Sequence, residues 1–295
     1  MKDLFLFDFI GNTPLVKAQN ILTKQGVSLF LKLEGNNPGG SVKDRAAYNM
    51  IASALERKEI KKGDHLIEAT SGNTGIALAM IAQQFGINIE LVMPENSTKE
   101  RVQTMQAYGA KVTLTPSESG IEGSREYAKK MVQEKEYIML NQFANDDNWK
   151  AHYKTTGPEI WKDTNGEISH FVSAMGTTGT IMGTSTFLKE KDSKIQIIGA
   201  QPTDNSKIPG IRKWSAEFLP KIFNPSKVDT VIEVSEAEAR EMTKILAKEE
   251  GVFAGMSSGG AVTAALKLSE TISKGVIVVV ICDRGDRYLS SDLFE

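Results

Sequence analysis

The chain has 295 residues, of which 40% are hydrophobic, so it can form one large domain or two of ordinary size with a full core. Its formal net charge of −2 gives no electrostatic basis for binding nucleic acid or an acidic membrane. A single cysteine excludes an intrachain disulfide framework, acidic residues interrupt the apolar N-terminus, and the apolar run 276–282 is too short to span a bilayer. We therefore expect a soluble cytoplasmic protein.

Short β-rich runs alternate with helical periodicity along almost the whole chain. The predicted strands are 28–33, 65–69, 88–93, 111–115, 138–141, 170–174, 196–200, 228–234 and 276–281. The predicted helices are 42–58, 74–85, 99–108, 121–134, 180–189, 236–250 and 259–272. Several strands are apolar at successive positions, which is typical of strands covered on both faces. This alternation predicts an α/β fold with mostly parallel sheets, and the polar stretch 141–154 is the best candidate for a domain junction.

The stretch NNPGGSVKDRAA, residues 36–47, ends a glycine-rich loop and opens a helix. Ser41 is predicted to be the N-cap, with Asp44 completing a capping box. Lys43 then lies in the first turn, where the helix dipole disfavours a cation by roughly 0.3 to 1 kcal/mol. One interpretation is that Lys43 points into water. The other is that its site lowers the pKa of the amine and favours a neutral nucleophile that can form a Schiff base.

Three further turns that open predicted helices combine glycines with hydroxyl side chains, and the first two follow strands: 70–75, 176–180 and 255–260. Backbone N–H groups at such helix starts bind carboxylate or phosphate, although simple capping would also explain the composition. The turn at 176–180 is neither a Walker loop nor a dinucleotide-binding motif. The segment after the last strand, with Asp283 and Arg287, is consistent with a salt-bridged turn. His65, His152 and His170 lack metal-ligand spacing, so no metal site is predicted.

Taken together, four motifs resemble the fold-type II pyridoxal-phosphate enzymes of the cysteine synthase and cystathionine β-synthase family. They are SVKDR at 41–45, TSGNTG at 70–75, GTTGT at 176–180 and GMSSG at 255–259. The resemblance covers nearly the whole chain. It implies two domains of the tryptophan synthase β type, with residues 36–145 as the smaller mobile domain and residues 1–35 and 146–295 as the larger one. It also implies a homodimer.

The resemblance assigns a role to particular residues. Lys43 would form an imine with pyridoxal 5′-phosphate and then act as the base for the substrate α-proton. The residues that would bind the cofactor besides Lys43 are Asn73, Gly176, Thr177, Thr178, Gly179, Thr180 and Ser257. The residues that would bind the substrate α-carboxylate are Thr70, Ser71, Gly72, Thr74 and Gln142. Ser257, a hydroxyl partner of the ring nitrogen, makes the ring a weaker electron sink than an aspartate would, which suits elimination at the β-carbon.

The implied reaction is β-replacement on O-acetylserine through an aminoacrylate, with sulfide as the second substrate. The segments IPGIRKW at 208–214 and CDRGDRYLS at 282–290 resemble a branch of the family with an arginine near the active-site entrance. Arg212 matches that arginine and would favour a larger anionic donor such as thiosulfate. The alternatives are a related eliminase or synthase, such as a serine/threonine dehydratase, and a non-catalytic protein that binds the cofactor or an amino acid.

Overall fold

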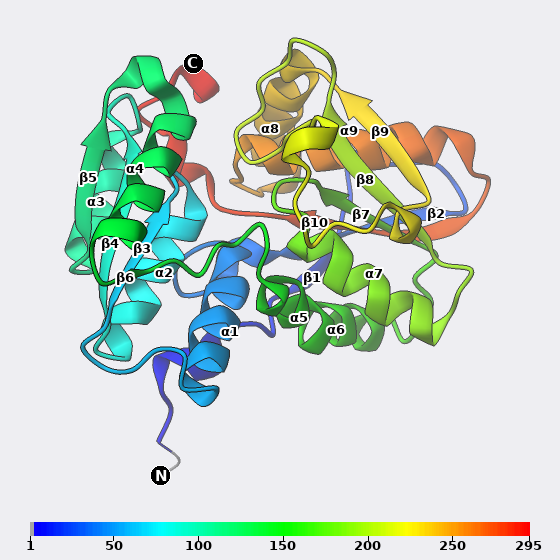
Figure 1. Cartoon of the computed structure of the whole chain (residues 1–295). Helices are drawn as coiled ribbons and strands as arrows, with labels where there is room; N and C mark the ends of the chain where they lie inside the picture. Colours follow the sequence, from blue (N-terminus) through cyan, green and yellow to red (C-terminus); the bar gives the residue numbers. More distant parts are fainter. Residues whose placement is uncertain (1–2) are drawn as a thin grey trace.

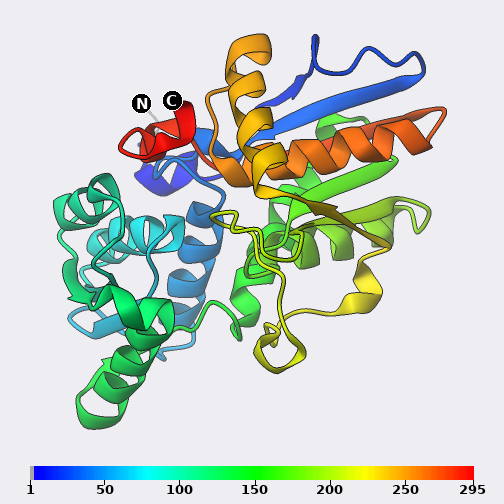
Figure 2. The same cartoon turned by 90° about the horizontal axis from the view of Figure 1, so that it is seen from above.

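The computed structural model describes residues 3–295; residues 1 and 2, at the start of the predicted larger domain, lie outside the described part. The chain forms two α/β units side by side, each built on its own sheet (Figure 1). Seen from above, helix α1 (Lys43–Glu56) lies between the two units (Figure 2). The predicted α/β class with mostly parallel sheets flanked by helices is confirmed.

The larger sheet has six strands in the order β1-β2-β10-β7-β8-β9. Only β1 pairs antiparallel, with β2; the other neighbours in this sheet pair parallel. The strands are β1 (Leu15–Lys17), β2 (Val27–Leu33), β7 (His170–Ala174), β8 (Gln196–Pro202), β9 (Thr230–Val234) and β10 (Gly275–Ile281). A parallel sheet needs helices on both faces, because each crossover returns the chain over the sheet.

Both faces of the larger sheet are covered, as its successive apolar residues require. Along β10, Ile277 and Val279 face the core under α8 and α9, whereas Val278 and Val280 face the opposite core with residues of α6 and α7. Figure 1 shows these two helix layers above and below the sheet. The helices are α5 (Asp146–Lys154), α6 (Thr156–Asp163), α7 (Gly179–Lys191), α8 (Glu236–Glu250) and α9 (Met256–Thr271).

The smaller sheet has four parallel strands in the order β5-β4-β3-β6. Leu66 of β3 packs into the core shared with α1 and α2, while its neighbour Ile67 packs with Ala128 and Met131 of α4. The strands are β3 (His65–Ala69), β4 (Asn88–Pro94), β5 (Lys111–Thr115) and β6 (Tyr137–Ile138), and the remaining helices are α2 (Asn73–Gln84), α3 (Lys99–Ala107) and α4 (Gly120–Glu134).

The predicted elements are confirmed within three residues at each end, but the polar stretch 141–154, predicted as a domain junction, also contains a helix that was not predicted. This helix is α5, and α6 follows directly. Helical periodicity was hard to see here because the buried face of α5 is mostly polar: Asp147, Asn148 and His152 are buried with Ala151. The three-residue β1 was also missed, being too short to give a clear alternation.

Candidate active site

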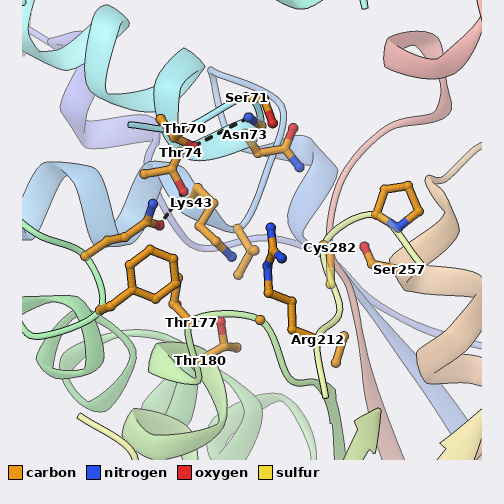
Figure 3. Close-up of a pocket in the computed structure, with 18 of the residues that line it drawn as sticks. Lys43, Thr70, Ser71, Asn73, Thr74, Thr177, Thr180, Arg212, Ser257 and Cys282 are labelled. Atoms are coloured by element: carbon orange, nitrogen blue, oxygen red, sulfur yellow. Dashed lines mark hydrogen bonds between the residues drawn. The ribbon is translucent and has the colours of Figure 1, made fainter. Parts of the chain in front are cut away.

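A cavity of about 230 Å³ lies where the two units meet, and its walls come from both. Every predicted site residue except Gly179 lines it: Lys43, Thr70, Ser71, Gly72, Asn73, Thr74, Gln142, Gly176, Thr177, Thr178, Thr180, Arg212 and Ser257. Figure 3 shows Lys43 and Arg212 pointing into this space, between the turn at 70–74 and the one carrying Thr177 and Thr180. Residues far apart in sequence therefore form one site.

Lys43 is the first residue of α1 and is only half-buried, yet its side chain faces the cavity rather than bulk water. Within residues 3–295, its amine has no hydrogen-bond partner or ion pair. Burial lowers the pKa of Lys43, and nearby acidic groups such as Asp283 only partly oppose this effect. The structure thus favours the interpretation of a reactive amine over that of a solvated lysine.

The predicted capping box at the start of α1 is wrong. Val42, not Ser41, occupies the N-cap position, although the Ser41 hydroxyl accepts a hydrogen bond from the Lys43 backbone N–H over 3.2 Å. The Asp44 carboxylate turns back to accept from the backbone N–H of Gly39. Asp44 therefore shapes the glycine loop before the helix, where a Cβ on Gly39 would lie 2.7 Å from its oxygen.

The predicted carboxylate-binding turn follows β3 and opens α2. Thr70, Ser71 and Gly72 line the cavity here, and unpaired backbone N–H groups at the start of a helix favour an anion. The Thr74 hydroxyl donates to Gln142 Oε1 over 2.8 Å, which holds the Gln142 side chain against this turn. The pair explains how a residue 68 positions further along the chain joins the turn.

The turn at 176–180 has the features of a phosphate cradle. Thr178, at φ +71°, is the N-cap of α7, and its buried hydroxyl oxygen has no partner in the described part of the chain. A Cβ on Gly176 would lie 2.6 Å from the Gly210 carbonyl oxygen, and one on Gly179 would lie 2.1 Å from Asn148 Oδ1. An unpartnered hydroxyl above closely packed glycines at a helix start fits a phosphate group.

Asn73 has partners that sequence reasoning missed. Its Nδ2 donates to Asp283 Oδ2 over 2.6 Å, and its Oδ1 accepts from Arg287 Nη1. The Tyr288 hydroxyl donates to the same Asp283 carboxylate over 2.7 Å. The segment after the last strand is thus only in part a salt-bridged turn: Arg284 pairs with Asp286 at the surface, while Asp283 and Arg287 point inward to Asn73.

Ser257 is buried in the first turn of α9, beside Cys282. The Cys282 backbone N–H donates to the Ser258 hydroxyl over 2.9 Å, and the Val42 N–H donates to the Cys282 carbonyl over 2.8 Å. These bonds join the starts of α1 and α9 through the end of β10. Burial raises the pKa of the Cys282 thiol to about 11, so the thiol is neutral at physiological pH.

Three arginines also line the cavity, and two of them were not predicted as site residues from the sequence. Arg101 of α3 and Arg125 of α4 line it together with Arg212. The Arg212 loop is tied to the phosphate turn, because its backbone N–H donates to the Met175 carbonyl over 2.9 Å and Trp214 Nε1 donates to the Gly176 carbonyl over 2.8 Å. Basic residues on ordinary surface helices carry no local sign that they face a cavity.

Across residues 3–295, His, Cys, Asp and Glu side chains form no group of three or more that could hold a metal ion. None of the helices in those residues has the length and apolar character needed to cross a membrane. The donor set of the cavity, an amine with hydroxyls and backbone amides, is suited to an aldehyde cofactor that carries a phosphate.

Residues 6–283 match the family described as pyridoxal-phosphate dependent enzyme. The chain belongs to this family and uses pyridoxal phosphate as its cofactor. A solved cysteine synthase from Entamoeba histolytica superposes with a TM-score of 0.93 at 37% identity, covering 99% of this chain and 91% of that one. O-ureido-L-serine synthase superposes with the same TM-score at 34% identity, covering 99% and 96%.

Within this family, the chain is more than half identical to two proteins named cysteine synthase B. Cysteine synthase B of Pseudomonas aeruginosa is 55% identical over 98% of this chain and 96% of its own length. Cysteine synthase B of Escherichia coli K12 is also 55% identical, over 97% and 94%. The chain is a pyridoxal-phosphate-dependent cysteine synthase, and the predicted cofactor and cysteine-forming reaction are confirmed.

Proposed function

We propose that this enzyme exchanges the acetyloxy group of O-acetyl-L-serine for a sulfur nucleophile, with Lys43 moving the α-proton. The observation that carries the proposal is the Lys43 amine, which faces the cavity with a lowered pKa and has no partner among the described side chains. Because a neutral amine can accept a proton, Nζ takes the α-proton of the substrate and later returns it. The Cβ–O bond breaks, acetate leaves with its electron pair, and a Cβ–S bond forms.

The walls of the cavity orient the two ligands. Thr177, Thr178, Thr180 and the backbone at 176–179 would hold the cofactor phosphate, whereas Thr70, Ser71, Thr74 and Gln142 would bind the substrate α-carboxylate. Ser257 would hydrogen-bond the ring nitrogen of the cofactor, and Asn73, held by Asp283 and Arg287, would hydrogen-bond the ring oxygen. When bound, pyridoxal phosphate withdraws electrons from the α-carbon of the attached amino acid.

The sulfur donor is proposed to be thiosulfate as well as sulfide. Arg212 supports this, because its guanidinium lines the cavity and makes no ion pair with any residue from 3 to 295. Burial and the neighbouring Arg125 lower the pKa of Arg212, so the charged form gains from an anion. Thiosulfate carries oxygens that a guanidinium can bind, whereas hydrosulfide does not.

Steady-state assays with O-acetylserine and either donor test the choice of donor. We expect cysteine from sulfide and S-sulfocysteine from thiosulfate, each with equimolar acetate. Parallel lines in double-reciprocal plots would follow from release of acetate before the donor binds. Sulfide turnover without thiosulfate turnover would reject the second donor, and release of ammonia with a keto acid would indicate an eliminase.

Replacing Lys43 tests the proposed catalytic residue. Lys43→Ala should lower kcat by at least about a thousandfold, because no other amine of the described chain lines the cavity. It should also remove the visible absorbance of the cofactor–lysine bond. Lys129→Ala on α4 is a matched control outside this cavity. Retention of that absorbance and of turnover in the Lys43 variant would contradict the assignment.

Three further features are proposed from the family resemblance: a homodimer, a cytoplasmic location and movement of residues 36–145 as a smaller domain. Helices α1 to α4 and the four strands of the smaller sheet all fall within 36–145, which supports the proposed boundary. Light scattering coupled to size exclusion measures the oligomeric state. A molecular mass near the 32.3 kDa of one chain would reject the dimer.

A further inference from the structure

A second arginine stands beside Arg212 at the cavity. Arg125 of α4 lines the same cavity, and it is close enough to lower the pKa of Arg212 by repulsion, after burial the largest effect. The only ion pair of Arg125 within the described residues is with Glu122, one turn earlier on the same helix, over 2.9 Å. The Glu122 side chain is 61% exposed, so this bond is well solvated and weak.

The charges around the cavity are unbalanced. Four cationic side chains line it, and of residues 3–295 no aspartate or glutamate does. Arg101 lies over the Tyr288 ring at 5.0 Å, and its buried Nε has no hydrogen-bond partner among the described residues. Arg125 is close enough to the buried Glu68 to lower the pKa of that carboxyl, but within residues 3–295 neither Arg125 nor Arg212 forms an ion pair with a buried carboxylate. Two guanidiniums that share a cavity repel each other, and an anion bound between them removes that repulsion.

An aromatic pair holds both guanidiniums in place. Arg125 lies over the Phe143 ring at 4.7 Å, and Arg212 lies over the Trp214 ring at 5.6 Å. The two rings contact each other edge to face, with centroids 5.6 Å apart, and Trp214 is anchored to the Gly176 carbonyl. Stacking on a ring leaves the N–H groups at the edge of a guanidinium free to donate to an anion.

We propose that Arg125 is a specificity-determining residue that binds, together with Arg212, the anionic oxygens of the sulfur donor. This inference rests on the proposed use of thiosulfate. A dianion with several oxygens can accept from both guanidiniums, while its terminal sulfur stays free to attack the β-carbon. Hydrosulfide, with one charge and no oxygen, gains little from the second arginine. The pair of arginines therefore selects between donors rather than supporting the chemistry common to both.

Neutralising Glu122 should have the opposite effect on thiosulfate use to removing Arg125. Its carboxylate competes with the donor for Arg125 Nη1, which it contacts at 2.9 and 3.1 Å. Removing this negative charge frees the guanidinium and strengthens the positive potential at the entrance. A residue that served only to support the fold would not show improved use of one donor when its partner is neutralised.

The experiment compares kcat/KM for thiosulfate and for sulfide at saturating O-acetylserine in four variants. In Arg125→Met the ratio of thiosulfate to sulfide should fall about tenfold or more. In Arg125→Lys, which keeps the charge but loses the planar donor pair, this ratio should fall less. Glu122→Gln should raise the ratio, mainly through a lower KM for thiosulfate.

The control variant is Lys130→Met. It removes an exposed positive charge from the same helix and should leave the ratio unchanged.

The outcomes separate the two proposals. A wild-type enzyme that does not use thiosulfate would reject the proposed donor, and this inference with it. A wild-type enzyme that uses thiosulfate, with a ratio unchanged in Arg125→Met, would overturn this inference alone. Should Arg125→Met not fold, Arg125→Lys and Glu122→Gln decide, and an unchanged ratio in both would overturn it.

Discussion

At the scale of single residues, burial sets the charge of the groups around the site. It lowers the pKa of Lys43, and it lowers the pKa of His152, which contacts the Thr180 hydroxyl, to about 3. Burial also raises the pKa of Glu68 to about 7. Glu68 Oε2 accepts from the Asn141 backbone N–H over 3.1 Å, directly before Gln142, which is proposed to bind the substrate. Such shifts arise because a low-dielectric interior disfavours the charged form.

Glu68 should make stability depend on pH. Its folded pKa lies above the unfolded value near 4.5, so its contribution to stability is present below pH 4.5 and is lost as pH rises through 7. Relative to wild type, Glu68→Gln should therefore gain free energy of unfolding between pH 5 and pH 8, on the order of a few kcal/mol. Urea titrations at both pH values measure this. An exposed control, Glu126→Gln, should show no such change, and a constant difference for Glu68→Gln would contradict the prediction.

At the scale of elements, a buried ion network fixes the start of α1. Arg45 binds Glu34, which follows β2, over 2.7 Å, and Glu159 of α6 over 2.6 Å. Burial acts to raise the pKa of Glu34, but Arg45 outweighs it and the pKa falls to about 2. Because Arg45 is two residues after Lys43, these bonds orient the turn that carries the reactive amine. The network thus connects the packing of three elements to the position of Lys43, the proposed catalytic residue.

Removing Arg45 should be costly. Arg45→Met leaves Glu34 buried without its counter-ion, so we expect a loss of about 3 to 5 kcal/mol in free energy of unfolding. The matched control is Arg240→Met on α8, whose partly exposed pairs with Glu236 and Asp292 should contribute much less. Thermal and urea unfolding of the two variants provide the comparison. Equal losses in both would show that the buried network is not what holds α1.

At the scale of the whole molecule, the cavity joins the two units. The segment after β10 bonds to the start of α1 and to Asn73, and Ser290 then contacts Glu100 of α3 through its backbone N–H over 3.0 Å. The cofactor site therefore uses loops from both sheets and the tail that connects them. A ligand that contacts both units stabilises them together, because it binds only the assembled arrangement.

Removal of the cofactor should loosen both loops at once. We expect faster amide hydrogen exchange at 70–75 and 176–180 in the cofactor-free protein, with a lower apparent Tm. Adding pyridoxal phosphate at about 100 times its Kd should restore about 2.7 kcal/mol. Pyridine, added at the same concentration, should restore nothing because it lacks the phosphate and aldehyde. Protection that changes in only one of the two loops would argue against a shared site.

The sequence by itself determined most of the local structure. Apolar runs identified the strands of both sheets, and the helix predicted at 236–250 is α8, whose start has a capping box formed by Ser235 and Glu238. The motifs also indicated the cofactor and the residues that line the cavity. These features are encoded in neighbouring residues, because strand periodicity, capping and backbone turns depend on contacts within a few positions.

Only the tertiary structure decided how the motifs meet and which other residues join them. Asp283 and Arg287 were consistent with a surface turn, yet they hold Asn73 across 210 and 214 positions. The polar buried face of α5 and the arginines at 101 and 125 gave no periodic signal, because their roles depend on what packs against them. Long-range contacts of this kind form only when the chain is folded, so no local pattern records them.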